Sequence, residues 1–193
     1  MEVLHIDTEF KVDDEIKLSY TYRHCQQVAY YTELLGKKLG FSKERLKEVV
    51  DAAFLHDIGK IAIPASILDK PSRLTFDEFE IIKSHPQVGF NLVKKMNLGS
   101  ETILNVVLHH HERYDGKGYP LGLESTKIPL EAKIVSITDA FDAMVSDRPY
   151  RKGLSVKDAV NELIANKRSQ FDPMLVDNFI TVIEENNNFY KER

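Results

Sequence analysis

Histidines and aspartates recur along this sequence at a spacing that suits a metal centre. His56 and Asp57 are adjacent, so one backbone turn offers an imidazole nitrogen and a carboxylate that is able to bridge two ions. The other residues of this kind follow at intervals of about 25 to 32 residues, close to the length of one helix and its connection. Successive helices would therefore each deliver one or two ligands to a common point. The candidate ligands are His24, His56, Asp57, His85, His110, His111 and Asp139.

The chemistry of this set favours two transition-metal ions. Neutral imidazoles and carboxylates suit Fe, Mn, Zn, Co or Ni, whereas the shortage of carboxylates argues against Mg. The candidates exceed what one ion requires when water and a substrate also bind, so we expect two ions about 3.5–4 Å apart. Asp57 is the natural bridge between them because it neighbours His56. Lys60 reads as a solvated surface residue, but one turn past Asp57 it would also reach a metal-bound oxyanion or a phosphate.

Each candidate has a plainer explanation when it is taken alone. A single histidine on an apolar helix face is more often a core residue than a ligand, and Asp139 would be an ordinary buried acid. The occurrence of all seven candidates in one chain, at regular spacing, favours the metal site. Successive helical side chains diverge by about 100°, so His109, His110 and His111 do not all face one point. Nearness to the following loop favours His110 and His111 as ligands and leaves His109 as a surface bystander.

The elements that must position these residues are helices. An apolar pattern of helical period and its capping residues predict segments over 14–39, 43–56, 76–96 with a kink at His85-Pro86, and 103–110. Further helices begin at Pro129, Ser155 and Asp172-Pro173, and residues 115–120 form a Gly-rich loop. There is no alternating strand pattern, internal repeat or low-complexity tract. The sequence therefore predicts an all-α fold.

Composition limits the class of protein. The 193 residues, 42% of them hydrophobic, suffice for one domain over 14–193, preceded by a short arm at residues 1–13. The formal charge of −4 argues against a nucleic-acid polymer as partner. The single Cys25 excludes an intramolecular disulfide. Without a secretory segment or a run of 18 apolar residues, we expect a cytoplasmic protein that does not contact a membrane.

Three motifs now carry a family resemblance. They are His56-Asp57-Ile58-Gly59-Lys60, the segment from His110 to Pro120 that reads HHERYDGKGYP, and Asp139-Ala140-Phe141-Asp142-Ala143-Met144 followed by Asp147-Arg148-Pro149-Tyr150-Arg151. Over about Tyr22 to Val182 the chain resembles the HD-GYP family of the HD phosphohydrolase superfamily. The resemblance implies a compact HD-domain bundle of about six to eight helices with a Gly-rich GYP loop. It also implies a site of two or three divalent ions and hydrolysis of cyclic di-GMP to linear pGpG, often on to GMP. Fe and Mn are the ions we expect first, with Zn, Ni and Co as alternatives.

The resemblance also implies residue roles. It makes the seven candidates metal ligands, with Asp57 and Lys60 as the catalytic pair and Lys60 in contact with the scissile phosphate. Arg148 and Arg151 would meet the phosphates or guanine bases of the substrate. Gly118, Tyr119 and Pro120 would form a lip or a docking surface for a diguanylate cyclase. Glu112 and Asp115 read as acids that anchor this loop or orient a ligand.

One position departs from the family pattern. Members with three metals place a Glu four residues before the first ligand histidine, and Tyr20 stands there in this chain. A phenol is a poor substitute for a bridging carboxylate, so we expect two metals. Two alternatives remain open beside the cyclic di-GMP phosphodiesterase. In the first, the chain is a catalytically weak module that binds a dinucleotide or a protein partner. In the second, it is a phosphohydrolase of another nucleotide such as cyclic GMP-AMP.

Overall fold

The computed structural model describes residues 20–147 and 152–186. Its elements in chain order are α2 (Tyr20–Lys38), α3 (Lys43–Leu55), the 3-10 helix η1 (Ile58–Ala62), α4 (Ala65–Leu68), α5 (Phe76–Lys83), α6 (His85–Met96), α7 (Glu101–His109), α8 (Leu130–Val145), α9 (Val156–Ala165) and α10 (Pro173–Glu185). Within these ranges there is no β-strand, and eight of the α-helices are eight residues or longer. The predicted all-α bundle is confirmed. No helix in the described part of the chain has both the length and the apolar character needed to cross a bilayer.

Capping side chains fix where the helices begin. Ser42, Ser155 and Asp172 each accept a hydrogen bond from the first turn of the helix that follows, and Thr75 forms a complete capping box with Glu78. These starts confirm the sequence prediction. Ser100 caps α7 in the same way, so this helix begins at Glu101, earlier than expected.

The helix predicted over residues 76–96 is in fact two helices. Ser84 separates α5 from α6, and Pro86 lies in the first turn of α6. Proline has no N–H to donate and its ring clashes with the carbonyl four residues earlier, so it ends one helix and starts the next. The short helices η1 and α4 were not predicted. The break has a consequence for the site, because it places His85 at the very start of a helix.

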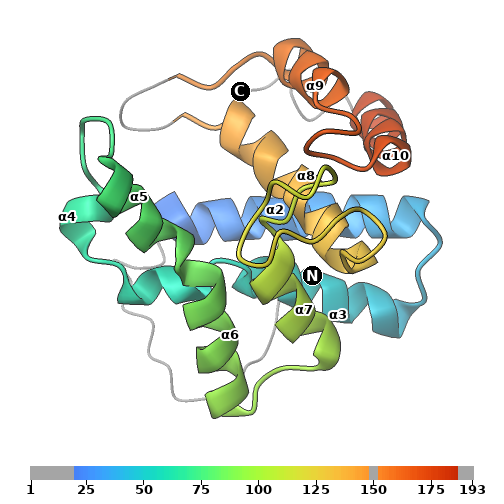
Figure 1. Ribbon diagram of the computed structural model, residues 1–193. Helices are drawn as coiled ribbons and strands as arrows, with labels where there is room; N and C mark the ends of the chain where they lie inside the picture. The colour runs from blue at the N-terminus through green and yellow to red at the C-terminus, as the bar shows by residue number, and fades with distance from the viewer. Residues whose placement is uncertain (1–19, 148–151, 187–193) are drawn as a thin grey trace.

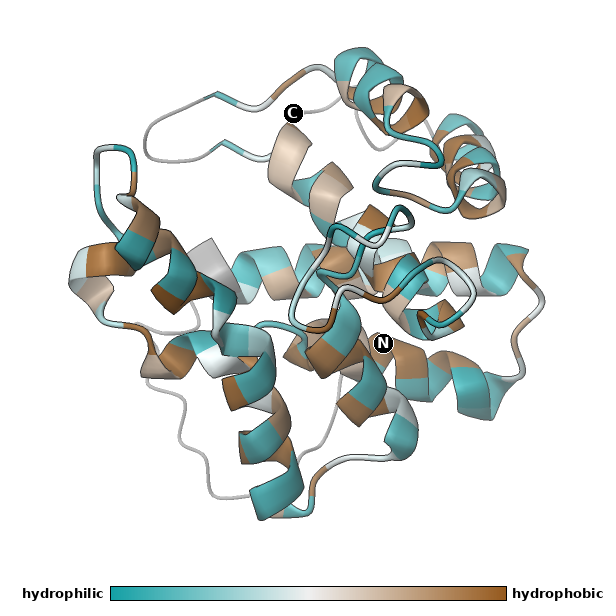
Figure 2. Ribbon diagram, viewed as in Figure 1, coloured by the Kyte–Doolittle hydropathy of each residue, from teal (hydrophilic) through white to brown (hydrophobic). Residues whose placement is uncertain are grey.

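Helix α8 lies at the centre of the molecule and shares two apolar cores with α2 (Figure 1). In one core, Ile137 and Phe141 of α8 pack with Leu35 of α2 and with α9 and α10. In the other, Val135 of α8 and Val28 of α2 pack with α3, α6 and α7. The long helices carry apolar and hydrophilic residues in separate bands, as amphipathic helices do (Figure 2).

Two close contacts join neighbouring elements of the fold. A side chain at Gly59 would meet the carbonyl oxygen of His85 at 1.9 Å, so η1 lies directly against the start of α6. The hydroxyls of Thr32 and Thr138 lie 2.9 Å apart and join α2 to α8.

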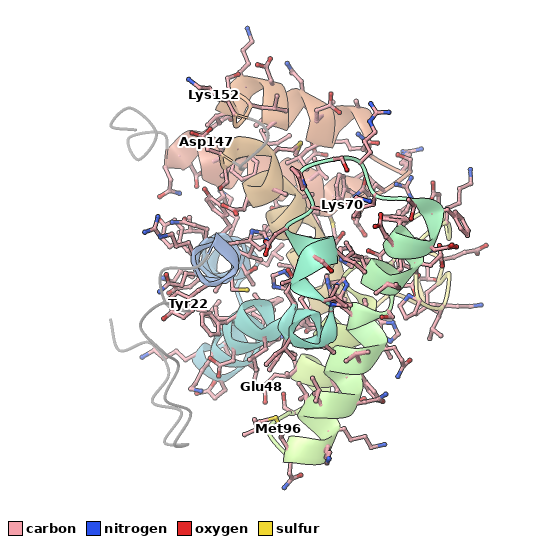
Figure 3. All side chains as sticks on the ribbon, turned by 90° about the vertical axis from the view of Figure 1, so that its left-hand side faces the viewer. Tyr22, Glu48, Lys70, Met96, Asp147 and Lys152 are labelled. Atoms are coloured by element: carbon pink, nitrogen blue, oxygen red, sulfur yellow. The ribbon has the colours of Figure 1, made fainter. Side chains whose placement is uncertain are left out.

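Several predicted features fall outside the described residues. They are the arm at residues 1–13, the substrate contacts Arg148 and Arg151, and the side chain of Tyr20. Asp147 and Lys152, which flank residues 148–151, lie at the same end of the molecule (Figure 3). The backbone N–H of Gly153 donates to Oδ1 of Asp147 at 2.7 Å and joins the chain on the two sides of this range.

Candidate metal centre

All seven predicted ligands come together from different elements of the fold. His24 lies in α2, His56 and Asp57 connect α3 to η1, and His85 begins α6. His110 and His111 follow α7, and Asp139 lies in α8. They form two groups, and within each group the ligand atoms lie within 4.8 Å of one another. We call them the first group, Asp57, His85, His110 and His111, and the second group, His24, His56 and Asp139.

Backbone carbonyls orient three of the histidine rings. Nδ1 of His56 lies 2.6 Å from the carbonyl oxygen of Ala53, and Nδ1 of His85 lies 2.7 Å from that of Ile82. Nδ1 of His110 lies 3.1 Å from the carbonyl oxygens of both Val106 and Val107. A carbonyl only accepts, so Nδ1 carries the proton in each ring. The lone pair on Nε2 is therefore directed into the centre, as a metal ligand requires.

These lone pairs converge without a proton between them. Nε2 of His85 lies 3.2 Å from Nε2 of His110 and 3.2 Å from Oδ1 of Asp57. Nε2 of His56 and Oδ1 of Asp57 are buried and have no hydrogen-bond partner among the described residues. An unpaired buried acceptor costs about 1–3 kcal/mol, and a cation placed among these atoms would remove that cost. The donor set therefore fits divalent metal ions.

Asp57 faces both groups with different oxygens. Its Oδ1 lies next to His85 in the first group, and its Oδ2 lies 3.3 Å from Nε2 of His56 in the second. A carboxylate in this position is able to bridge two ions, one on each oxygen. Burial alone would raise the pKa of Asp57, but its neighbours His56 and Lys60 outweigh it and hold the pKa well below its ordinary value.

His110 and His111 differ from His24 in the direction of their pKa shifts. Burial lowers the pKa of His111 to about 4 and, together with His111, lowers the pKa of His110 well below its ordinary value. Both rings are neutral near pH 7, which is the form that binds metal. Burial also acts to lower the pKa of His24, but hydrogen bonds to Asp139 and Asp142 outweigh it and raise this pKa to about 9. A metal ion at His24 would therefore displace a proton.

Lys60 brings a cation to the edge of the centre. Its Nζ donates to Oδ2 of Asp57 at 2.5 Å. Burial acts to lower the pKa of Lys60, but the Asp57 carboxylate outweighs it, so the net shift is upward and the amine stays protonated near pH 7. Lys60 is thus positioned to contact an anion bound at the metals.

The loop after α7 folds back onto the centre. A side chain at Gly118 would meet the backbone nitrogen of Arg113 at 2.4 Å, so only glycine allows this approach. Glu112 is buried and accepts hydrogen bonds from the backbone N–H groups of Leu121 and Leu123, at 2.7 and 2.9 Å. The Tyr119 ring stacks on His111, with centroids 4.8 Å apart. Glu112 therefore anchors the loop as predicted, and Tyr119 contacts a candidate ligand.

Asp115 anchors the same loop at its other side. Its carboxylate accepts hydrogen bonds from Nε and Nη2 of Arg113, and from the backbone N–H of Lys117. The backbone N–H of Asp115 donates to the carbonyl oxygen of Ser169 at 2.9 Å and ties the loop to the connection before α10. Asp115 is thus a structural acid of the loop and lies outside both ligand groups.

One expectation was wrong and one residue was missed. His109 lies outside both groups, but it is buried, with 8% of its surface exposed, and is not a surface residue. The side of α7 that turns away from the ligands still packs against neighbouring helices. Asp142, with its carboxylate 2.6 Å from Nδ1 of His24, was not singled out from the sequence. The sequence feature that could have identified Asp142 is its position three residues after Asp139, which places both on the same face of a helix.

Comparison with known proteins places the chain among HD-domain proteins. The family model described as "HD domain" matches residues 14–175. A cyclic di-GMP phosphodiesterase from Thermotoga maritima is 38% identical over 99% of this chain and 50% of its own length. The response regulator RpfG of Xanthomonas campestris, also described as a cyclic di-GMP phosphodiesterase, is 43% identical over 81% of this chain and 42% of its own length.

Two further comparisons bear on specificity and fold. A 3′3′-cGAMP-specific phosphodiesterase from Vibrio cholerae is 34% identical over 84% of this chain and 31% of its own length. Among solved structures, an HDG"Y"P protein from Bdellovibrio bacteriovorus matches with a TM-score of 0.71 and 21% identity, over 85% of this chain and 52% of its own length. At that identity the structural match establishes the fold alone. The chain spans about half the length, or less, of these curated relatives.

Proposed function

The chain belongs to the HD-domain family, in its HD-GYP branch, and from this premise we propose that it is a metal-dependent phosphodiesterase that hydrolyses cyclic di-GMP to linear pGpG, and onward to GMP. The observation that supports this proposal most is the convergence of the two ligand groups on Asp57, whose two oxygens face one group each. Two ions held by these residues would supply Lewis acidity toward the phosphate and an acidified water. Fe or Mn is the metal that we propose first, and Zn, Ni and Co are the alternatives, since imidazole and carboxylate donors suit all of these ions.

The residues of the chain have distinct tasks in this mechanism. The seven candidate ligands would hold the ions, and Asp57, with one oxygen facing each group, would be shared between them. The Lys60 ammonium contacts the phosphoryl oxygens and offsets the negative charge that develops on them as the ribose 3′ oxygen leaves. Arg148 and Arg151 bind the second phosphate or the guanine bases through their planar guanidinium groups.

The decisive experiment is product analysis. Protein purified without oxygen and loaded with Mn(II) or Fe(II) is incubated with cyclic di-GMP, and nucleotides are separated by chromatography. We expect pGpG to appear first and GMP later. Parallel reactions with cyclic GMP-AMP test the second candidate, which is favoured by the relative specific for that substrate. Binding of cyclic di-GMP without turnover by the metal-loaded protein would instead identify a binding module.

The number of metals has its own test at Tyr20. We propose two ions per chain because a phenol stands where the family pattern has a carboxylate. Elemental analysis should give about two ions, and Tyr20→Glu should add capacity for a third. A matched Tyr20→Phe variant should still bind two. Three ions in anomalous diffraction from the unaltered protein would refute the binuclear proposal.

The partner and the compartment are also proposals. Lys117 and Leu121 of the GYP loop are exposed and offer the surface that a diguanylate cyclase would contact. Leu121→Asp should weaken co-purification with such a cyclase and leave metal content unchanged. We propose the cytoplasm as the location, and cell fractionation tests it.

A further inference from the structure

We propose that Asp142 is a positioning residue for His24 and that it supports metal binding by the second group alone. The inference rests on the proposed function in one respect, because it takes the two groups as metal ligands. Asp142 has 1% of its surface exposed. Its Oδ2 lies 2.6 Å from Nδ1 of His24, and its Oδ1 accepts a hydrogen bond from Oγ of Ser146 at 3.0 Å. Both oxygens have partners, so the carboxylate is held in one orientation.

The partner of His24 differs in kind from those of the other rings. His56, His85 and His110 direct Nδ1 to neutral backbone carbonyls of the preceding turn. His24 directs Nδ1 to a buried anion that comes from another helix, 118 residues later. Burying a carboxylate is costly unless it is paired, so its presence here needs an explanation. An anionic acceptor fixes the tautomer and makes the ring a stronger electron donor than a carbonyl does.

The arrangement directs the other nitrogen of His24 toward the centre. With Nδ1 held by Asp142, Nε2 lies 3.1 Å from Oδ1 of Asp139 and 3.9 Å from Oδ2 of Asp57. Asp139 and Asp142 are one turn apart on α8, so the same helix supplies a ligand and the support of a second ligand. Among the described residues, the side-chain hydrogen bonds of Asp142 reach His24 and Ser146 and no residue of the first group. Loss of Asp142 should therefore weaken one metal position and spare the other.

Equilibrium dialysis of the metal-free chain against Mn(II) alone tests this inference. The unaltered protein should bind two ions. In Asp142→Ala we expect one ion to bind as before and the other about 10–100-fold more weakly. Asp142→Asn should give a smaller loss at the same position, because its amide oxygen still accepts from Nδ1. If the alanine variant does not fold, as judged by circular dichroism, the asparagine variant carries the test.

A matched control separates positioning from general damage to α8. Thr138→Val also removes a buried hydrogen bond from α8, to Thr32, but the hydroxyl bonds only to Thr32 and to the carbonyl oxygen of Val135 among the described residues, and neither is a member of the two groups. It should lower the melting temperature and leave both Mn(II) affinities unchanged. A double-mutant cycle gives the second readout, since Asp142→Ala should change nothing further in a His24→Ala background.

Two results would overturn the inference. One is an equal loss of affinity at both positions, and the other is an undiminished effect of Asp142→Ala when His24 is absent. Failure of the proposed function looks different. Two bound Mn(II) ions without hydrolysis of any cyclic dinucleotide would reject that function and leave the role of Asp142 standing. Hydrolysis together with wild-type Mn(II) binding by Asp142→Ala would reject the role of Asp142 alone, and an unaltered chain that binds no Mn(II) would reject both.

Discussion

Asp57 is the residue on which the two ligand groups depend most. We expect Asp57→Ala to abolish hydrolysis and to lower bound metal, because it removes the carboxylate whose two oxygens face one group each. His56→Ala should also abolish hydrolysis and lower bound metal, because it removes an imidazole ligand of the second group. Elemental analysis and the product assay measure both effects. Asp51→Ala, which removes an α3 aspartate paired with Lys47 outside the centre, should keep metal and turnover. Full metal content and activity in Asp57→Ala would reject the two-metal site.

Alanine variants of His109, His110 and His111 distinguish the effect of losing a buried side chain from the effect of losing a metal ligand. His110→Ala and His111→Ala should lose metal and activity, because both rings are neutral near pH 7 and belong to the first group. His109→Ala should keep both. Because His109 is buried, its loss should still lower stability, by about 1–3 kcal/mol. Metal content and thermal melting of the three variants distinguish the effects. Loss of metal in His109→Ala alone would show a ligand register shifted by one residue.

At the scale of elements, the loop between α7 and α8 depends on one buried acid. Glu112→Ala removes the acceptor for the N–H groups of Leu121 and Leu123, so we expect faster amide hydrogen exchange over residues 118–123. Turnover should fall, because Tyr119 of this loop stacks on His111. Metal content should stay near that of the unaltered protein.

The matched variant for this loop is Glu112→Gln. It keeps one side-chain oxygen as an acceptor, so exchange should rise less than in Glu112→Ala. Unchanged exchange in both variants would mean that the other contacts of the loop, such as the packing of Gly118 against Arg113 and the hydrogen bonds of Asp115, hold it without Glu112.

At the scale of the whole molecule, the centre links α2, α3, η1, α6, α7 and α8. Metal binding should therefore stabilise the entire fold. With free metal at 100 times its dissociation constant, one site adds about 2.7 kcal/mol to the free energy of unfolding. We expect a chelator to lower the melting temperature and Mn(II) to restore it in proportion to the logarithm of its concentration. Asp57→Ala should respond much less. A melting temperature indifferent to chelator and metal would contradict metal binding at this centre.

Local chemistry explains what the sequence by itself determined. The caps at Ser42, Thr75, Ser155 and Asp172 were predictable because each bonds to residues within its own first helical turn. The seven ligand candidates were predictable from residue type and helix-length spacing, and the GYP loop from its glycines. All of these signals lie within a few residues or follow from a regular repeat.

Only the tertiary structure decided how those residues are oriented and what surrounds them. It placed His109 in the interior, because burial depends on the helices packed against α7. It turned one oxygen of Asp57 to each group, and it set Asp142 against His24 across 118 residues of chain. Contacts of this kind join side chains from helices that meet only after folding. No spacing in the sequence specifies them, because the angle and depth at which two helices pack are set by all the side chains between them.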